Sequence, residues 1–160
     1  MICTGIGYDA HRLAEGRALI LGGVRIPHSK GLEGHSDADA LAHAICDAIF
    51  GALGEGDIGT FFPDTDPRWQ GQSSLFFLRE AARLAKARGG RVEQVDSTII
   101  AERPKLAPFI PAMRAKLSEA LGLPPGRVGV KATTNEGMGF LGRGEGIAAL
   151  ATACVTLPDS

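Results

Sequence analysis

The 160-residue sequence lacks an excess of charge of either sign. Its 17 Lys and Arg residues nearly balance its 18 Asp and Glu residues, which gives a formal net charge of −1 at pH 7. Domains that bind nucleic acid or anionic membranes usually carry a clear excess of positive charge. The composition therefore favours neither nucleic acid nor a membrane as a partner.

Cysteine and long apolar runs are also scarce. Cys3, Cys46 and Cys154 are isolated from one another, which predicts free thiols in a reducing compartment. No apolar run approaches the about 18 residues of a membrane-spanning helix, and the N-terminus lacks the order of a signal peptide. We therefore expect a cytoplasmic protein. Cys46 follows His43 by three residues, which leaves a His-x-x-Cys metal pair as an alternative to a half-buried thiol.

The chain has no internal repeat, linker or low-complexity segment, and its 44% hydrophobic content is enough for one core. We expect a single domain over residues 1–160. Apolar spacing predicts helices over about 37–53, 73–87 and 110–121, strands over 2–8, 92–101, 128–132 and 147–156, and a hairpin over 17–26. This mixture predicts an α+β fold, in which a mixed four-stranded sheet carries helices packed on one face.

The stretch from Gly34 to His43 has the pattern of a loop that leads into the first helix. Ser36 is a good N-cap residue, and Asp39 three positions later completes a variant of the capping box. Asp39, His43 and Asp47 are spaced i, i+4, i+8, so they are predicted to share a face roughly opposite the apolar stripe. The helix is therefore expected to present a histidine between two carboxylates.

A second candidate group follows the first predicted strand. Asp9 and His11 are two residues apart, so in an extended segment both side chains point to the same side. With His43 they make a possible three-ligand metal site. The alternative is that Asp9 caps a turn and His11 is exposed, because Asp-x-His is a weak pattern by itself.

The glycine-rich run Gly142–Gly146 and the hydroxyls of Thr133 and Thr134 have the chemistry of a phosphate site. The run matches neither a Walker A loop nor a dinucleotide fingerprint, and a tight turn at a subunit contact is the alternative. Glu136 and the carboxylates of the loop at 54–66 are suitable ligands for a harder cation such as Mg²⁺. No Ser-His-Asp order or activated cysteine is evident. From the residues alone we predict metal-assisted phosphoryl or phosphate-ester chemistry.

Several motifs occur together in one order along the chain. They are Gly7–His11, Gly34–Asp39 with His43, Gly56–Gly59, Phe62–Asp66, Pro104–Leu106, Lys131–Glu136 and Phe140–Gly146. In this the sequence resembles the 2-C-methyl-D-erythritol 2,4-cyclodiphosphate synthase family over essentially its whole length. The resemblance implies a single catalytic domain and a homotrimer, formed through the sheets, with active sites between neighbouring subunits. It also implies a phosphorus-oxygen lyase of the non-mevalonate isoprenoid pathway, which cyclises 4-diphosphocytidyl-2-C-methyl-D-erythritol 2-phosphate and releases CMP.

The resemblance also implies roles for individual residues. Asp9, His11 and His43 would bind Zn²⁺, Glu136 would help to hold Mg²⁺ or Mn²⁺, and His35 and Thr134 would stabilise the transition state. The substrate-binding positions would be Ser36, Asp57, Ile58, Gly59, Phe62, Pro63, Asp64, Thr65, Asp66, Ala101, Pro104, Lys105, Leu106, Ala107, Thr133, Phe140 and Arg143.

This chemistry explains why the sequence shows no side-chain nucleophile. The substrate's own 2-phosphate attacks the β-phosphate, so the protein has mainly to position the reacting groups and to offset their charge. Two alternative functions would use the same residues. One is a metal-dependent phosphohydrolase that uses zinc-bound water, and the other is a non-catalytic trimeric module that binds nucleotides or isoprenoid diphosphates.

Overall fold

A mixed five-stranded sheet organises the fold in the computed structural model, which describes residues 1–159. The strands, in spatial order, are β4 (Lys30–Leu32), β1 (Ile2–Glu15), β7 (Gly146–Thr156), β5 (Arg91–Ile100) and β6 (Lys131–Thr133). The pairs that involve β1 and β7 are antiparallel, whereas β5 and β6 are parallel. The predicted mixed sheet is therefore confirmed.

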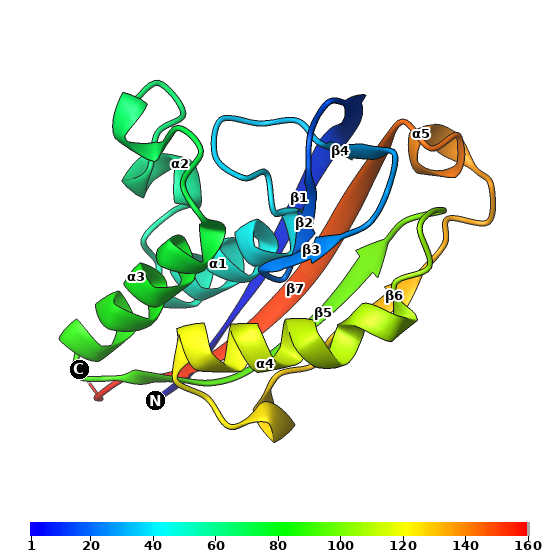
Figure 1. The fold of residues 1–160 in the computed structure, drawn as a ribbon. Helices are drawn as coiled ribbons and strands as arrows, with labels where there is room; N and C mark the ends of the chain where they lie inside the picture. The colour runs from blue at the N-terminus through cyan, green and yellow to red at the C-terminus, as the bar shows by residue number, and fades with distance from the viewer. Residues whose placement is uncertain (160) are drawn as a thin grey trace.

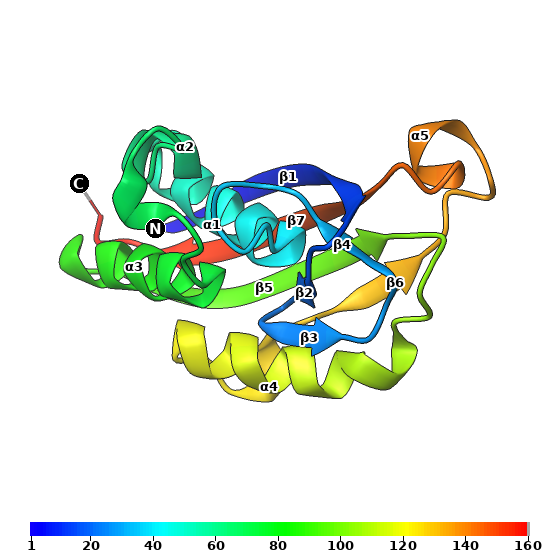
Figure 2. The ribbon, with the colours of Figure 1, turned by 45° about the horizontal axis from the view of Figure 1, so that its top comes forward.

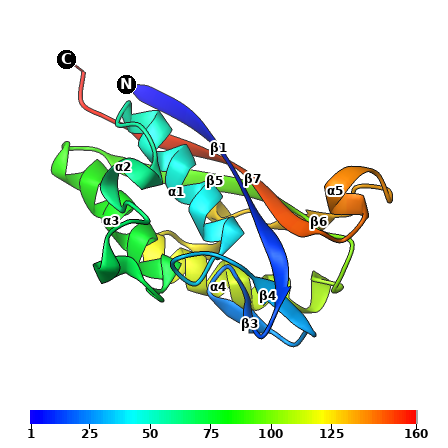
Figure 3. The same ribbon diagram turned by 90° about the horizontal axis from the view of Figure 1, so that it is seen from above.

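The helices are α1 (Ala40–Leu53), α2 (Ile58–Phe61), α3 (Ser74–Ala87), α4 (Ile110–Leu121) and the single turn α5 (Gly139–Gly142). Helices α1, α3 and α4 cover one face of this sheet, whereas α2 packs against α1 and α5 lies beyond the end of the sheet, next to β7 (Figures 1 and 3). The short hairpin of β2 (Leu19–Leu21) and β3 (Val24–Ile26) packs against α4, where Gly22 approaches Met113 (Figure 2). No helix in residues 1–159 is long and apolar enough to cross a membrane.

The sheet has five strands, whereas four were predicted. The first strand does not end near Tyr8 but continues to Glu15, and its last residues, Leu13 to Glu15, pair with β4. The charged residues Asp9, Arg12 and Glu15 obscure the strand pattern in the sequence beyond Tyr8. The additional length matters for function because it keeps Asp9 and His11 inside regular sheet.

The first helix begins later than predicted, at Ala40, and its N-cap is Asp39 rather than Ser36. One Asp39 carboxylate oxygen accepts hydrogen bonds from the backbone N–H groups of Ala42 at 3.0 Å and Gly22 at 2.9 Å. The other accepts from Gly23 at 2.8 Å. Asp39 thus satisfies orphan donors at the helix start and joins them to the hairpin.

The prediction that α1 has a polar face is also wrong. Of its 14 residues 12 are buried, because β1 and β7 cover one side and α3 another. Asp39 is fully buried and Asp47 is half-buried, with the Asp47 carboxylate accepting the Ile58 N–H at 2.8 Å. His43 alone of the three predicted polar residues reaches the site described below.

Helix α1 lies unusually close to β1, and glycine makes this possible. A Cβ atom on Gly7 would overlap the carbonyl oxygen of Ala44, and one on Gly5 would overlap that of Ala48. Because glycine and alanine leave no side chain between them, the two backbones pack almost in direct contact. This close approach places His43 next to the side chains that β1 presents toward the helix.

Candidate active site

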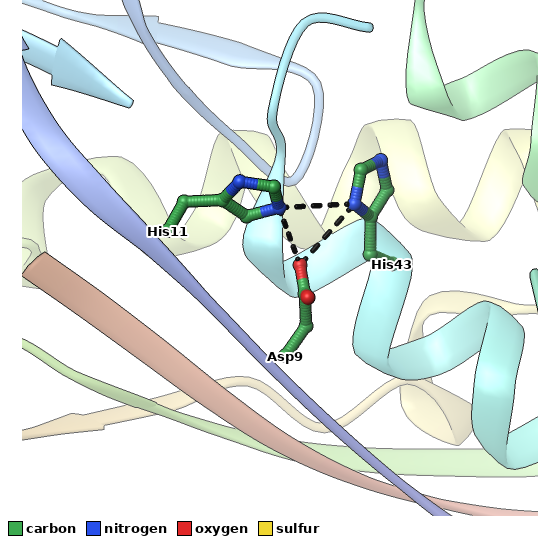
Figure 4. A group of neighbouring side chains, drawn as sticks. All are labelled: Asp9, His11 and His43. Atoms are coloured by element: carbon green, nitrogen blue, oxygen red, sulfur yellow. Dashed lines mark hydrogen bonds and ion pairs between the residues drawn. The ribbon is translucent and has the colours of Figure 1, made fainter. Parts of the chain in front are cut away.

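Three predicted ligands meet between the strand and the helix (Figure 4). Asp9 and His11 project from the same side of β1, as the alternation predicted, and His43 reaches them from α1. Asp9 Oδ2 lies 2.8 Å from His11 Nε2 and 3.2 Å from His43 Nδ1, and the two ring nitrogens are 3.3 Å apart. One oxygen and two nitrogens therefore face a common point.

The donor set fits a tetrahedral metal ion with one position left open. Ligand atoms at about 2.0–2.1 Å from a tetrahedral zinc ion lie about 3.3–3.4 Å from one another. The measured separations of 2.8, 3.2 and 3.3 Å need only a small adjustment to reach that geometry. Three protein ligands with an open fourth position are typical of a catalytic rather than a structural site.

Hydrogen bonds at the far side of each ring set the orientation of the two histidines. His11 Nδ1 donates to the carbonyl oxygen of Glu33 at 2.8 Å, which directs Nε2 toward Asp9. His43 Nε2 lies 3.2 Å from the Ser36 hydroxyl and 2.8 Å from the Ser74 hydroxyl, which directs Nδ1 toward Asp9. Such partners are typical of metal-binding histidines, because they fix the ring and its tautomer.

The same contacts shift the pKa values of Asp9 and His11 in the absence of metal. Burial opposes ionisation of Asp9, but the hydrogen bond from His11 and the neighbouring imidazole of His43 outweigh it and lower the pKa of the Asp9 carboxyl to about 2. Burial also opposes protonation of His11, yet the hydrogen bond and charge of Asp9 raise the pKa of its imidazole. Since His11 Nδ1–H already donates to Glu33, only the imidazolium can also donate to Asp9.

The cluster opens into a cavity of about 390 Å³. Besides the three ligands, its lining includes seven positions predicted to meet substrate or the transition state, namely His35, Ser36, Ile58, Gly59, Phe62, Pro63 and Asp64. A larger cavity of about 840 Å³ lies between α3 and α4 and is lined by none of these residues. The chemistry therefore points to the smaller cavity.

The comparisons with known proteins agree with this geometry. The sequence profile of the YgbB family matches residues 2–156. The chain belongs to the YgbB family. It is 62% identical over 147 residues to "2-C-methyl-D-erythritol 2,4-cyclodiphosphate synthase" of Syntrophotalea carbinolica, a match that covers 92% of this chain and 90% of the relative.

Two further matches concern a longer protein and a complex. "Bifunctional enzyme IspD/IspF" of Anaeromyxobacter sp. is 62% identical over 152 residues, and the match covers 95% of this chain but only 39% of that protein. A solved structure of 2C-methyl-D-erythritol-2,4-cyclodiphosphate synthase in a CDP-bound form superposes with a TM-score of 0.87 at 44% identity. That match covers 96% of this chain and 99% of the solved one.

Not every predicted site residue of this YgbB chain lies at the cavity. Asp57 caps α2 through the Thr60 N–H at 2.9 Å, and the Asp66 carboxylate binds Arg68. Asp66 still contacts the site, because its carbonyl oxygen accepts from His35 Nε2 at 2.9 Å. Asp57 and Asp66 thus hold the loop that carries the cavity residues, and neither they nor Thr65 lines the cavity itself.

The remaining predicted residues form a second group at the opposite end of the molecule from α2, around β6 and α5 (Figure 1). They are Ala101, Pro104, Lys105, Leu106, Ala107, Thr133, Thr134, Glu136, Phe140 and Arg143, and none of them lines the cavity of the metal cluster. The Glu102 carboxylate joins their loops by accepting the N–H groups of Asn135 at 3.2 Å and Gly137 at 2.8 Å. Within one chain the two groups are separate.

The structure also adds residues that the sequence did not assign to the site. Trp69 and Phe77 line the cavity, and Ser74 contacts His43. The cluster of aromatic residues between positions 61 and 77 could have indicated in the sequence that this loop is packed. A single serine at the start of a helix gives no comparable indication of its contact with His43. Cys46 is fully buried in α1 and is not part of the ligand cluster, so the structure does not support the His-x-x-Cys alternative.

Proposed function

We infer that this YgbB chain cyclises 4-diphosphocytidyl-2-C-methyl-D-erythritol 2-phosphate to 2-C-methyl-D-erythritol 2,4-cyclodiphosphate. An oxygen of the 2-phosphate forms a bond to the β-phosphorus, the bond from that phosphorus to the bridging oxygen breaks, and CMP leaves with this oxygen. The observation that carries this inference is the open three-ligand cluster at a cavity, in a chain 62% identical to a named synthase over 147 residues.

In this proposal Asp9, His11 and His43 hold Zn²⁺, which suits a set of two imidazoles and one carboxylate. Glu136 helps to hold Mg²⁺ or Mn²⁺. When bound, the two cations would offset negative charge on the phosphates. His35 lies at the cavity beside the cluster, where its ring can orient a phosphate group, and Thr134 is assigned the matching role in the second group. The single domain over residues 1–160 and the cytoplasmic location stay predictions.

We propose that a homotrimer unites the two groups of residues. The cytidine pocket (Ala101–Ala107 with Thr133), Thr134 and Glu136 of one subunit would then face the zinc ligands of the next. The outer face of the sheet supports this arrangement. Ile2 and Ile6 are each 71% exposed, and Tyr8 (52%) lies directly opposite Leu150 (41%) on the neighbouring strand. Large apolar side chains exposed together mark an interaction surface.

Replacing Ile6 with aspartate should break the trimer into monomers, because assembly would bury unpaired carboxylates. In sedimentation velocity, Ile6→Asp should have the mass of one chain, whereas the wild type should have the mass of three chains. Ala115→Asp, a change of the same kind on the exposed side of α4, should stay trimeric. A trimeric Ile6→Asp variant would contradict this interface.

A direct assay tests the reaction. Protein, zinc and magnesium are incubated with the cytidine diphosphate substrate in H₂¹⁸O, and the products are followed by ³¹P NMR and mass spectrometry. We expect CMP and a cyclic diphosphate without solvent ¹⁸O. Linear product with ¹⁸O in its phosphate would instead identify a hydrolase that uses metal-bound water, and binding without turnover would identify a non-catalytic module.

Zinc affinity should fall as the pH is lowered. The raised pKa of His11 means that a proton competes with the metal for Nε2 at a higher pH than at an ordinary histidine. Below that pKa the affinity should drop about tenfold per pH unit, since one proton is displaced for each ion bound. Chelator competition between pH 8 and pH 5.5 would measure this, and a constant affinity across the range would contradict it.

A further inference from the structure

A chain of hydrogen bonds leads from the metal cluster to the start of α3. His43 Nε2 lies 2.8 Å from the hydroxyl oxygen of Ser74. The Ser74 hydroxyl in turn bonds Asp37 Oδ1, and the Ser74 N–H donates to Asp37 Oδ2 at 2.9 Å. Ser74 is fully buried and is the first residue of α3. Asp37 therefore holds Ser74 through both its backbone and its side chain.

The donors and acceptors give this chain a direction. An ionised carboxylate can only accept, so the single hydroxyl hydrogen of Ser74 is donated to Asp37. The Ser74 oxygen must then accept from His43, which requires the hydrogen of His43 to be on Nε2. The second neighbour, the Ser36 hydroxyl, lies farther away at 3.2 Å and also accepts the Ala38 N–H at 3.3 Å.

We propose that Asp37 and Ser74 are positioning residues that hold His43 in its metal-binding tautomer. With the hydrogen on Nε2, the lone pair of Nδ1 faces Asp9 and His11, as ligation requires. This inference rests on the metal centre of the proposed function. It adds two residues, neither of which lines the cavity, and it makes the start of α3 part of the metal site.

A merely structural role would look different. Asp37 also accepts the Asp39 N–H at 3.1 Å, so its loss can loosen the segment that precedes α1. Loosening alone would change stability but not the preferred nitrogen of the His43 hydrogen. The test therefore needs a readout of the tautomer and of zinc binding in folded protein.

The main variant is Ser74→Ala, and Ser97→Ala is its matched control. Ser97 is also a buried serine with one hydroxyl hydrogen bond, to the Gly129 carbonyl oxygen at 2.8 Å, but it lies in β5 away from the cluster. Asp37→Asn is a second variant, in case Ser74→Ala fails to fold, and its new side chain has the same shape as that of aspartate. Its amide can no longer accept all three of the hydrogen bonds made by the carboxylate.

Chelator competition should show zinc binding weakened about 10- to 100-fold in Ser74→Ala and in Asp37→Asn, but unchanged in Ser97→Ala. Long-range ¹H–¹⁵N spectra of the zinc-free protein should show His43 as Nε2–H in the wild type and as a mixture of tautomers in the two variants. Folded variants with wild-type zinc affinity and an unchanged tautomer would overturn the inference while leaving the metal centre intact. A wild type that binds no zinc, or a His43→Ala variant that binds it normally, would instead overturn the metal centre and the inference with it.

Discussion

Replacing His43 with alanine is expected to abolish tight zinc binding and to lower the rate of CMP release at least about 1000-fold. Removing one of three protein ligands leaves only Asp9 and His11, too few to hold a tetrahedral ion that must also keep an open position. A bound cation supplies several kcal/mol of charge stabilisation in the transition state, and each 1.36 kcal/mol corresponds to a factor of about ten in rate.

The measurement combines elemental analysis for zinc with steady-state CMP release at saturating magnesium. Asp9→Asn and His11→Ala should behave like His43→Ala, and all three variants should remain trimers, because the ligands face α1 rather than the outer side of the sheet. His28→Ala is a suitable control because His28 is an exposed loop histidine outside the cluster. Full zinc content in all three ligand variants would refute the assignment.

The sequence could predict that Asp9 and His11 share one side of the strand, because the alternation of side chains is a local property of an extended chain. It could also predict α3 and α4 within one or two residues, since each keeps an exposed side and hence a clear apolar period. The periodicity of α1 was misleading for the opposite reason. This helix is covered on nearly every side, so Asp39 looked like a partner of His43 although it is a buried cap.

The separation of the site into two groups was beyond local reasoning. The positions around Lys105, Thr134 and Glu136 belong to the same motif pattern as the metal cluster. Within one chain they nevertheless lie across the sheet from it, around the edge strand β6, and none of them lines its cavity. In the proposed trimer they would meet the metal cluster of a neighbouring subunit, and spacing along the chain does not encode such a contact. Ser74 escaped notice for a similar reason, since its partner His43 is 31 residues away.

The close approach of α1 to β1 gives the prediction with the largest expected effect on stability. Gly7→Ala should destabilise the zinc-free protein by about 3 kcal/mol or more, at the upper end of what overpacking usually costs. The new Cβ would overlap the Ala44 carbonyl oxygen, which is backbone and cannot rotate away, so the helix itself must move. Restricting the unfolded chain would return only about 0.4–1 kcal/mol, too little to offset that strain.

Gly51→Ala is the matched control, because it adds the same methyl group to the same helix–strand interface. A Cβ on Gly51 would have the Ile6 carbonyl oxygen as its nearest neighbour at 3.7 Å, an ordinary contact, and alanine favours a helix interior by about 1 kcal/mol over glycine. Urea unfolding should therefore show a large loss for Gly7→Ala and a small gain for Gly51→Ala. Since His43 directly precedes Ala44, a helix pushed off the strand should also bind zinc more weakly. Equal stability of the two variants would mean that glycine at position 7 is not what allows α1 to approach β1 so closely.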